Sequence, residues 1–150
     1  MKLILVCHGE NVPEEVNPEK PLSEKGISDI EKIGELLKKE NNFADEIYYS
    51  GKKRAEETSQ ILAKHILKGN RISNEEGLSP EDDIKPWADK IGNFETDVML
   101  VGHLPFMEKL ASLLIDNDEN KKIIDFHQGT AAVLIKNAEG KWIVENVLQP

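Results

Sequence analysis

The stretch Met1-Lys-Leu-Ile-Leu-Val-Cys7-His8-Gly9-Glu10 decides the fold. Its apolar run is typical of a buried strand and ends in a His-Gly pair, which places an imidazole at the C-terminal end of a predicted central strand. In open α/β sheets, ligands bind at the C-terminal ends of the strands. A second stretch, Val98-Met-Leu-Val-Gly102-His103-Leu-Pro105, repeats the arrangement. Two histidines at two strand ends indicate a site that His8 and His103 share.

Length and composition favour a single globular domain over residues 1–150. The chain is 39% hydrophobic and 31% charged, which is enough apolar material for one core. No window approaches the roughly 18 apolar residues of a membrane span, and the run Leu3–Val6 is too short for a signal peptide. We therefore expect no membrane partner. The single cysteine, Cys7, forms no intramolecular disulfide, and a cytoplasmic location is the simplest interpretation.

The charge of the chain argues against nucleic acid as a partner. The net charge is −9 and the sequence pI is about 5.0, whereas phosphate backbones require a basic face. A phosphorylated substrate stays compatible with this charge, because a few basic residues in one cleft create a local positive potential. The sequence leaves the oligomeric state open.

Predicted strands and helices alternate along the chain. Ser23 is the predicted N-cap of a helix in which apolar residues recur at helical spacing from Ile27 to Leu37. Pro86 favours an irregular first turn in its predicted helix. The other predicted elements are strands at 2–6, 44–49 and 97–101, helices at 54–67, 81–91 and 105–115, at most a short strand at 71–72, and a hairpin of 130–135 with 142–147. This order predicts an α/β fold, with a mostly parallel sheet, helices on both faces and an antiparallel edge hairpin.

His8 is a candidate nucleophile. A neutral imidazole whose other nitrogen is held by a backbone carbonyl can attack phosphorus, and Gly9 lets the backbone approach a ligand closely. His103 lies before a helix whose N-terminal N–H groups favour anions, so it is placed to donate to a phosphate oxygen. The alternatives are a polar residue that ends a strand and an ordinary loop histidine.

Arg54 is the third candidate for a phosphate site. It opens a helix directly after a strand, in the segment Ser50-Gly-Lys-Lys-Arg54. From there an arginine can reach the same crevice and hold a phosphate with two hydrogen bonds. The alternative is a solvated arginine paired with Glu57 or Thr58. Together with the two histidine turns, Arg54 favours a shared phosphate site.

Five short motifs run in order over nearly the whole chain. They are Leu5-Val-Cys7-His8-Gly9-Glu10, Pro21-Leu-Ser-Glu-Lys-Gly26, Tyr49-Ser50 with Arg54-Ala-Glu-Glu-Thr58, Gly77-Leu-Ser-Pro80, and Leu100-Val-Gly-His103-Leu-Pro105. This ordered set resembles the histidine phosphatase superfamily, which includes phosphoglycerate-mutase-like enzymes. Within it, the chain most resembles the small SixA-type phosphohistidine phosphatases. Its length leaves no room for the cap insertions with which larger relatives enclose small substrates.

The resemblance implies a metal-independent mechanism without a cofactor. His8 attacks phosphorus and is transiently phosphorylated, Arg54 and His103 hold the non-bridging oxygens, and water then hydrolyses the phosphohistidine. Gly9 and position 7 line the same site. In many relatives an acidic residue protonates the leaving group; Glu81, with Asp82 and Asp83, is the candidate here, the alternative being helix-start charges in solvent. The expected partner is a phosphorylated protein, with a small phosphorylated metabolite as the alternative.

Cys7 departs from the family pattern, which has Arg-His-Gly here. A thiol cannot replace the charge-assisted hydrogen bonds of an arginine. Losing them costs a few kcal/mol of transition-state stabilisation, or roughly two to three decades in rate. Three interpretations stay open. The protein is a weaker phosphatase, or another cation substitutes (Lys20, Lys52 or Lys53), or the chain is a catalytically impaired phosphate- or phosphoprotein-binding relative.

The sequence also bears on two other roles for Cys7. A cysteine-dependent phosphatase needs the pattern Cys-x5-Arg, but position 13 is Pro13, so Cys7 is not expected to be the nucleophile. Cys7, His8 and His103 are suitable metal ligands by type, but no metal-ligand spacing is visible and we expect no metal.

Overall fold

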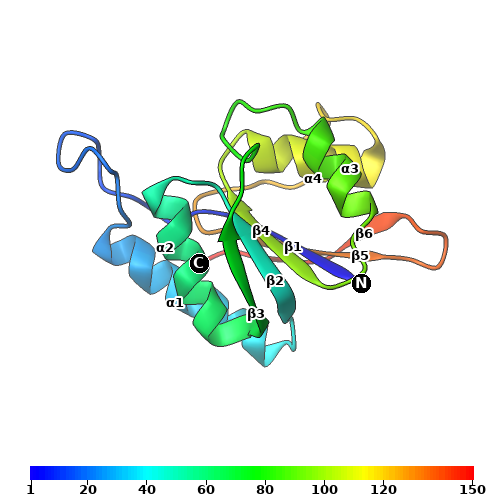
Figure 1. The fold of residues 1–150 in the computed structure, drawn as a ribbon, viewed down its shortest axis with the longest axis horizontal. Helices are drawn as coiled ribbons and strands as arrows, with labels where there is room; N and C mark the ends of the chain where they lie inside the picture. Colours follow the sequence, from blue (N-terminus) through cyan, green and yellow to red (C-terminus); the bar gives the residue numbers. More distant parts are fainter.

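The computed structural model describes residues 1–150 and places a six-stranded sheet between two pairs of helices (Figure 1). The elements in chain order are β1 (Lys2–Cys7), α1 (Glu24–Lys39), β2 (Ala44–Tyr49), α2 (Lys53–Ile66), β3 (Leu67–Asn74), α3 (Lys85–Gly92), β4 (Val98–Gly102), α4 (Phe106–Asp116), β5 (Ala131–Lys136) and β6 (Trp142–Leu148). No helix has the length and apolar character needed to cross a membrane.

The sheet brings the two predicted histidine turns to one edge. Its strand order is β3-β2-β4-β1-β5-β6, in which β3, β2, β4 and β1 are parallel and β5 and β6 are added antiparallel. β1 and β4 are neighbours, and their register pairs Cys7 with Gly102. The residues that follow, His8 and His103, therefore leave the sheet side by side. The predicted α/β fold with an antiparallel edge hairpin is confirmed.

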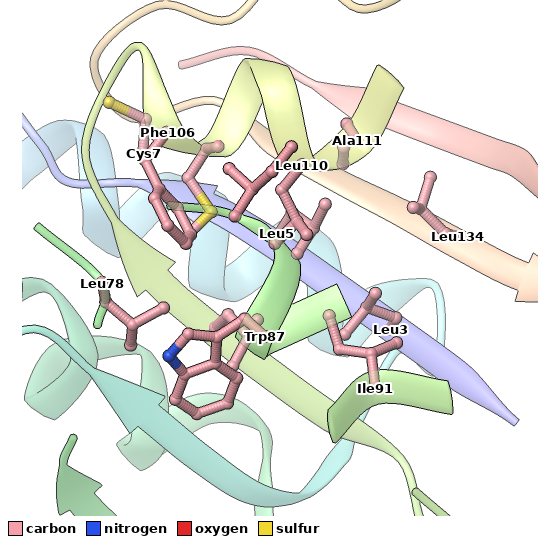
Figure 2. Close-up of a cluster of buried hydrophobic side chains, with 14 of the residues drawn as sticks. Leu3, Leu5, Cys7, Leu78, Trp87, Ile91, Phe106, Leu110, Ala111 and Leu134 are labelled. Atoms are coloured by element: carbon pink, nitrogen blue, oxygen red, sulfur yellow. The ribbon is translucent and has the colours of Figure 1, made fainter. Parts of the chain in front are cut away.

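Alternate side chains of β1 fill two separate cores. Leu3, Leu5 and Cys7 belong to the core under α3 and α4, whereas Ile4 and Val6 belong to the core under α1 and α2. Figure 2 shows the first of these cores. A strand covered on both faces reads as a continuous apolar run, which is the pattern of β1. Burying each such side chain stabilises the fold by about 1.5–3 kcal/mol, so the strand that carries His8 is held firmly.

The start of α1 is fixed against the turn that follows His8. The Ser23 hydroxyl accepts a hydrogen bond from the Gly26 N–H at 3.0 Å, as expected for an N-cap, and donates to the Glu10 carboxylate at 2.6 Å. A side chain at Gly26 would clash with the Glu10 backbone carbonyl. Close backbone approach therefore requires glycine here, and it holds α1 beside the candidate site.

Two predicted elements differ from the structure. β3 spans Leu67–Asn74, not just residues 71–72; as an edge strand it pairs only with β2, so its polar side chains stay in solvent and give no alternating pattern. The predicted helix 81–91 begins only at Lys85, with Pro86 in its first turn. Asp82 and Asp83 instead accept backbone hydrogen bonds in the preceding turns, from Ser79 and Lys85 respectively.

Candidate functional site

The imidazoles of His8 and His103 face each other at the C-terminal ends of β1 and β4. Their ring centroids are 5.0 Å apart and the rings are inclined by 55°. The backbone joins the two turns as well, because the His8 N–H donates to the Gly102 carbonyl at 3.0 Å. Both side chains are buried, at 7% exposure for His8 and 1% for His103. The structure thus brings together the two histidines that the sequence predicts to share a site.

The hydrogen bonding of His8 leaves one ring nitrogen free. Its Nδ1 lies 2.7 Å from the Gly9 carbonyl oxygen, which can only accept, so Nδ1 carries the proton. Nε2 has no protein partner and is not fully buried. Burial lowers the pKa of His8 to about 4, and the positive charges of Arg54 and Lys20 contribute. At neutral pH, Nε2 therefore presents an unprotonated lone pair.

His103 is hydrogen-bonded to a serine through one ring nitrogen, and its other ring nitrogen has no partner. Its Nε2 lies 2.5 Å from the buried Ser50 hydroxyl, and its Nδ1 is the one buried side-chain polar atom without a partner. Burial lowers its pKa to about 3, with further contributions from His8, Arg54, Lys52 and Lys20. An orphaned buried ring nitrogen is costly unless a ligand satisfies it. A bound anion could accept a hydrogen bond from this nitrogen. Its negative charge would also favour the protonated form of the ring.

Thr58 links the strand turn to the helix that carries Arg54. Its hydroxyl accepts from the Gly9 N–H at 3.1 Å and donates to the Arg54 carbonyl at 2.8 Å. The Arg54 side chain is half-buried and pairs with no carboxylate; neither Glu57 nor Thr58 holds its guanidinium. Its charge acts on both imidazoles. An unpaired, partly desolvated guanidinium beside two histidines is suited to an anion.

The backbone N–H of Gly9 is hydrogen-bonded within the protein. Its N–H is occupied by Thr58, and a Cβ atom here would lie 2.8 Å from Cγ1 of Ile30. The close approach that requires glycine at this position in the structure is therefore to helix α1.

Cys7 is a neutral thiol at the edge of the core. It is 1% exposed and lies beside Phe106 at one end of the cluster (Figure 2). Burial raises its pKa to about 12, although the backbone N–H groups of Gly129 and Leu104 and the charge of Arg54 oppose the shift. A thiol with this pKa is not an activated nucleophile. It supplies no positive charge to the site.

The remaining predicted residues divide between the site and its surroundings. Lys20 and Lys52 act electrostatically on the histidines, whereas Lys53 pairs with Glu56 at 3.6 Å. Glu81 is exposed, has no hydrogen bond to either histidine and is not among the charges that shift their pKa. No group of three or more His, Cys, Asp or Glu side chains, including Cys7 with the two histidines, is arranged to hold a metal ion.

The sequence does not identify Ser50 and Thr58 as functional residues. Both lie within the Tyr49-Ser50 and Arg54–Thr58 motifs, but serine and threonine in a loop and a helix give no signal of their partners. Their hydrogen bonds to His103 and Gly9 cross from one strand end to another and from strand to helix. Only the tertiary fold brings these pairs together.

The fold and the site define a class: an α/β protein with two facing histidines and unpaired cations at the carboxyl edge of its sheet. The sequence profile described as histidine phosphatase superfamily (branch 1) matches residues 3–90, more than half of the chain. The chain belongs to this superfamily. The match includes His8 and Arg54, and the structure adds His103. A comparison with curated protein sequences gives no match.

Solved structures share the fold over the whole chain. The protein histidine phosphatase SixA complexed with tungstate is 17% identical, with a TM-score of 0.88 over 100% of this chain and 97% of that one. A SixA-type putative phosphohistidine phosphatase from Agrobacterium tumefaciens is 24% identical, with a TM-score of 0.81 over 99% and 97%. Phosphoserine phosphatase from Entamoeba histolytica, in complex with 3-phosphoglyceric acid, is 18% identical, with a TM-score of 0.71 over 99% and 97%.

Proposed function

We propose that this protein is a metal-independent phosphatase that forms a phosphohistidine on His8. The observation that carries the proposal is the free Nε2 of a neutral His8, facing His103 and surrounded by cations that no carboxylate neutralises. The chain as a whole carries a charge of −9, so these unpaired cations form a locally positive site on an acidic protein. It attracts a dianionic phosphoryl group.

The reaction follows from the placement of each group. Nε2 of His8 attacks phosphorus, and the bond to the leaving group breaks on the opposite side. The Gly9 carbonyl, which accepts from Nδ1–H, stabilises the positive charge that develops on the ring. Arg54 and a ring N–H of His103 hold the non-bridging oxygens and stabilise their charge in the transition state. Water then attacks the phosphohistidine and releases inorganic phosphate and free His8.

We propose phosphohistidine in a protein as the substrate. The charges that act on the two imidazoles are all positive, so no carboxylate stands out as a proton donor to the leaving group. An alkyl alcohol leaves slowly without such a donor, but a protonated imidazole leaves readily. Glu81, exposed in the turn before α3, is the candidate acid if alkyl phosphates are hydrolysed. A small phosphorylated metabolite is the second candidate substrate.

Position 7 sets the expected rate. The buried neutral thiol of Cys7 supplies none of the phosphate contacts of an arginine, so we propose an activity that is reduced by roughly two to three decades relative to a site with arginine here. In the limiting case, the protein binds phosphoproteins with little turnover. The proposed location is the cytoplasm.

Comparing three substrate types tests the proposal. A phosphohistidine-containing protein, an aryl phosphate and an alkyl phosphate differ in how much their leaving groups need a proton donor. Because general acid catalysis contributes typically 10²–10⁴-fold, we expect kcat/KM to be at least about 100-fold lower for the alkyl phosphate. Equal turnover of alkyl phosphates, lost in Glu81→Gln, would instead support the small-metabolite phosphatase. Binding of all three without turnover would support the binding relative.

A further inference from the structure

The loop that carries Lys20 is anchored beside the turn that carries His8. Lys20 ends the loop between β1 and α1 with a left-handed backbone (φ 51°), and its N–H donates to the Asn17 carbonyl at 2.9 Å. The base of the loop closes through a bridge between Asn11 and Leu22, and the Leu22 N–H donates to the Glu57 carboxylate of α2 at 2.8 Å. Both ends of the loop are therefore anchored next to the turn that carries His8.

Lys20 is a half-buried cation without a partner. No carboxylate lies within ion-pair distance of its ammonium group, although the chain has 28 acidic and 19 basic residues. Lys53, by contrast, pairs with Glu56. Among the cations, only Arg54 and Lys20 lower the pKa of both His8 and His103; Lys52 acts on His103 alone. The charge of Lys20 therefore acts on both imidazoles of the candidate site.

A polar cavity lies between this loop and the start of α2. It has a volume of about 390 Å³ and no hydrophobic lining residue. One wall is formed by Pro18 and Glu19, immediately before Lys20, and the other by Gly51–Arg54 and Glu56. In Figure 1 the loop projects from the body of the fold near the start of α2. Arg54 lines this cavity, and Lys20 follows the wall residue Glu19 directly in the chain. The loop that carries Lys20 therefore lies across the cavity from the start of α2, where Arg54 lies.

We propose that Lys20 binds the phosphoryl group of the substrate and, with Arg54, supplies the second positive charge that Cys7 does not. The inference rests on the proposed function of the His8 site. A phosphoryl dianion held by Arg54 alone is incompletely neutralised, and both histidines are neutral at pH 7. A lysine contributes a point charge without the geometric fork of an arginine, so it restores charge balance and only part of the positioning.

The test compares Lys20→Gln with Lys20→Arg and with Lys64→Gln. Lys64 is an exposed lysine on α2 and is the matched control for loss of one charge. The probe is tungstate, measured by calorimetry and as an inhibitor of turnover. A charge-assisted hydrogen bond of about 1.5–3 kcal/mol corresponds to about 10- to 100-fold weaker tungstate binding in Lys20→Gln. Lys20→Arg should stay within about 3-fold of the natural protein, and Lys64→Gln should be unchanged.

Two further readouts separate binding from a structural role. The pKa of His8, measured by NMR, should rise in Lys20→Gln, because a nearby positive charge is removed. In a Cys7→Arg background, the effect of Lys20→Gln on tungstate affinity should shrink below about 3-fold, because the introduced guanidinium supplies the second charge.

The outcomes distinguish this inference from the proposed function. Tungstate binding by the natural protein with an unchanged affinity in Lys20→Gln overturns the role of Lys20 and leaves His8 chemistry intact. The absence of both tungstate binding and His8 phosphorylation in the natural protein overturns the proposed function itself. If Lys20→Gln lowers tungstate affinity equally in the natural protein and in the Cys7→Arg background, Lys20 does not supply the charge that is missing at position 7.

Discussion

Lowering the pH from 7 to 5 should destabilise this protein through His8 and His103. Burial lowers their pKa values in the folded state to about 4 and about 3, from 6.5 in an exposed histidine. Between these values and 6.5, the unfolded chain binds protons that the folded protein does not. The stabilisation is therefore fully present above pH 6.5 and is lost as the pH falls towards 4.

The size of the effect follows from the same pKa values. Relative to pH 7, each imidazole costs about 2 kcal/mol of unfolding free energy at pH 5. The two together approach about 4 kcal/mol as an upper limit, since each ring also influences the other. This is a large share of the roughly 5–15 kcal/mol of a typical domain.

Denaturant unfolding at pH 7 and pH 5 measures the prediction. The natural protein is compared with a variant in which His8 and His103 are both replaced by glutamine, and with His127→Gln as a control. His127 lies in an exposed loop beside Asp125. The double variant should lose much less stability between the two pH values than the natural protein does. An equal loss in both would refute the argument that the two imidazoles are held neutral by burial.

Three further predictions concern residues around the histidines. Ser50→Ala should lower kcat/KM about 10-fold, because it removes a hydrogen bond of about 1.5 kcal/mol that positions His103; steady-state kinetics with a pH profile measures this. Cys7→Arg should raise kcat/KM about 100-fold, and a decrease would show that the site depends on the thiol. Gly26→Ala should destabilise the fold by about 1–3 kcal/mol in denaturant unfolding, because its methyl group meets the Glu10 carbonyl.

The sequence predicts the central strands of the sheet well, for a physical reason. β1 and β4 are buried on both faces, so they read as unbroken apolar runs, and each ends at a turn marked by an adjacent histidine and glycine. The same pattern predicts that His8 and His103 lie together. The full length of β3 is not predicted, because this edge strand is held by backbone hydrogen bonds to one neighbour and needs no apolar face.

The features that the sequence could not predict depend on tertiary contacts. Which nitrogen of His8 is free depends on the Gly9 carbonyl, and the position of His103 depends on Ser50, 53 residues away in the chain. The loss of a charge at Cys7 was visible in the sequence, but three lysines were equal candidates to replace it. The structure favours Lys20, because it is half-buried and unpaired, whereas Lys52 is exposed and Lys53 pairs with Glu56.

The central claim is that His8 carries the phosphoryl group during turnover, and trapping that intermediate tests it most directly. The protein is mixed with a phosphohistidine donor, quenched in base, in which phosphohistidine is stable, and mapped by mass spectrometry. We predict one phosphoryl group, located on His8, which is absent in His8→Gln and is more persistent in the natural protein than in Cys7→Arg. Turnover without a label on His8, and undiminished turnover in His8→Gln, would contradict the account.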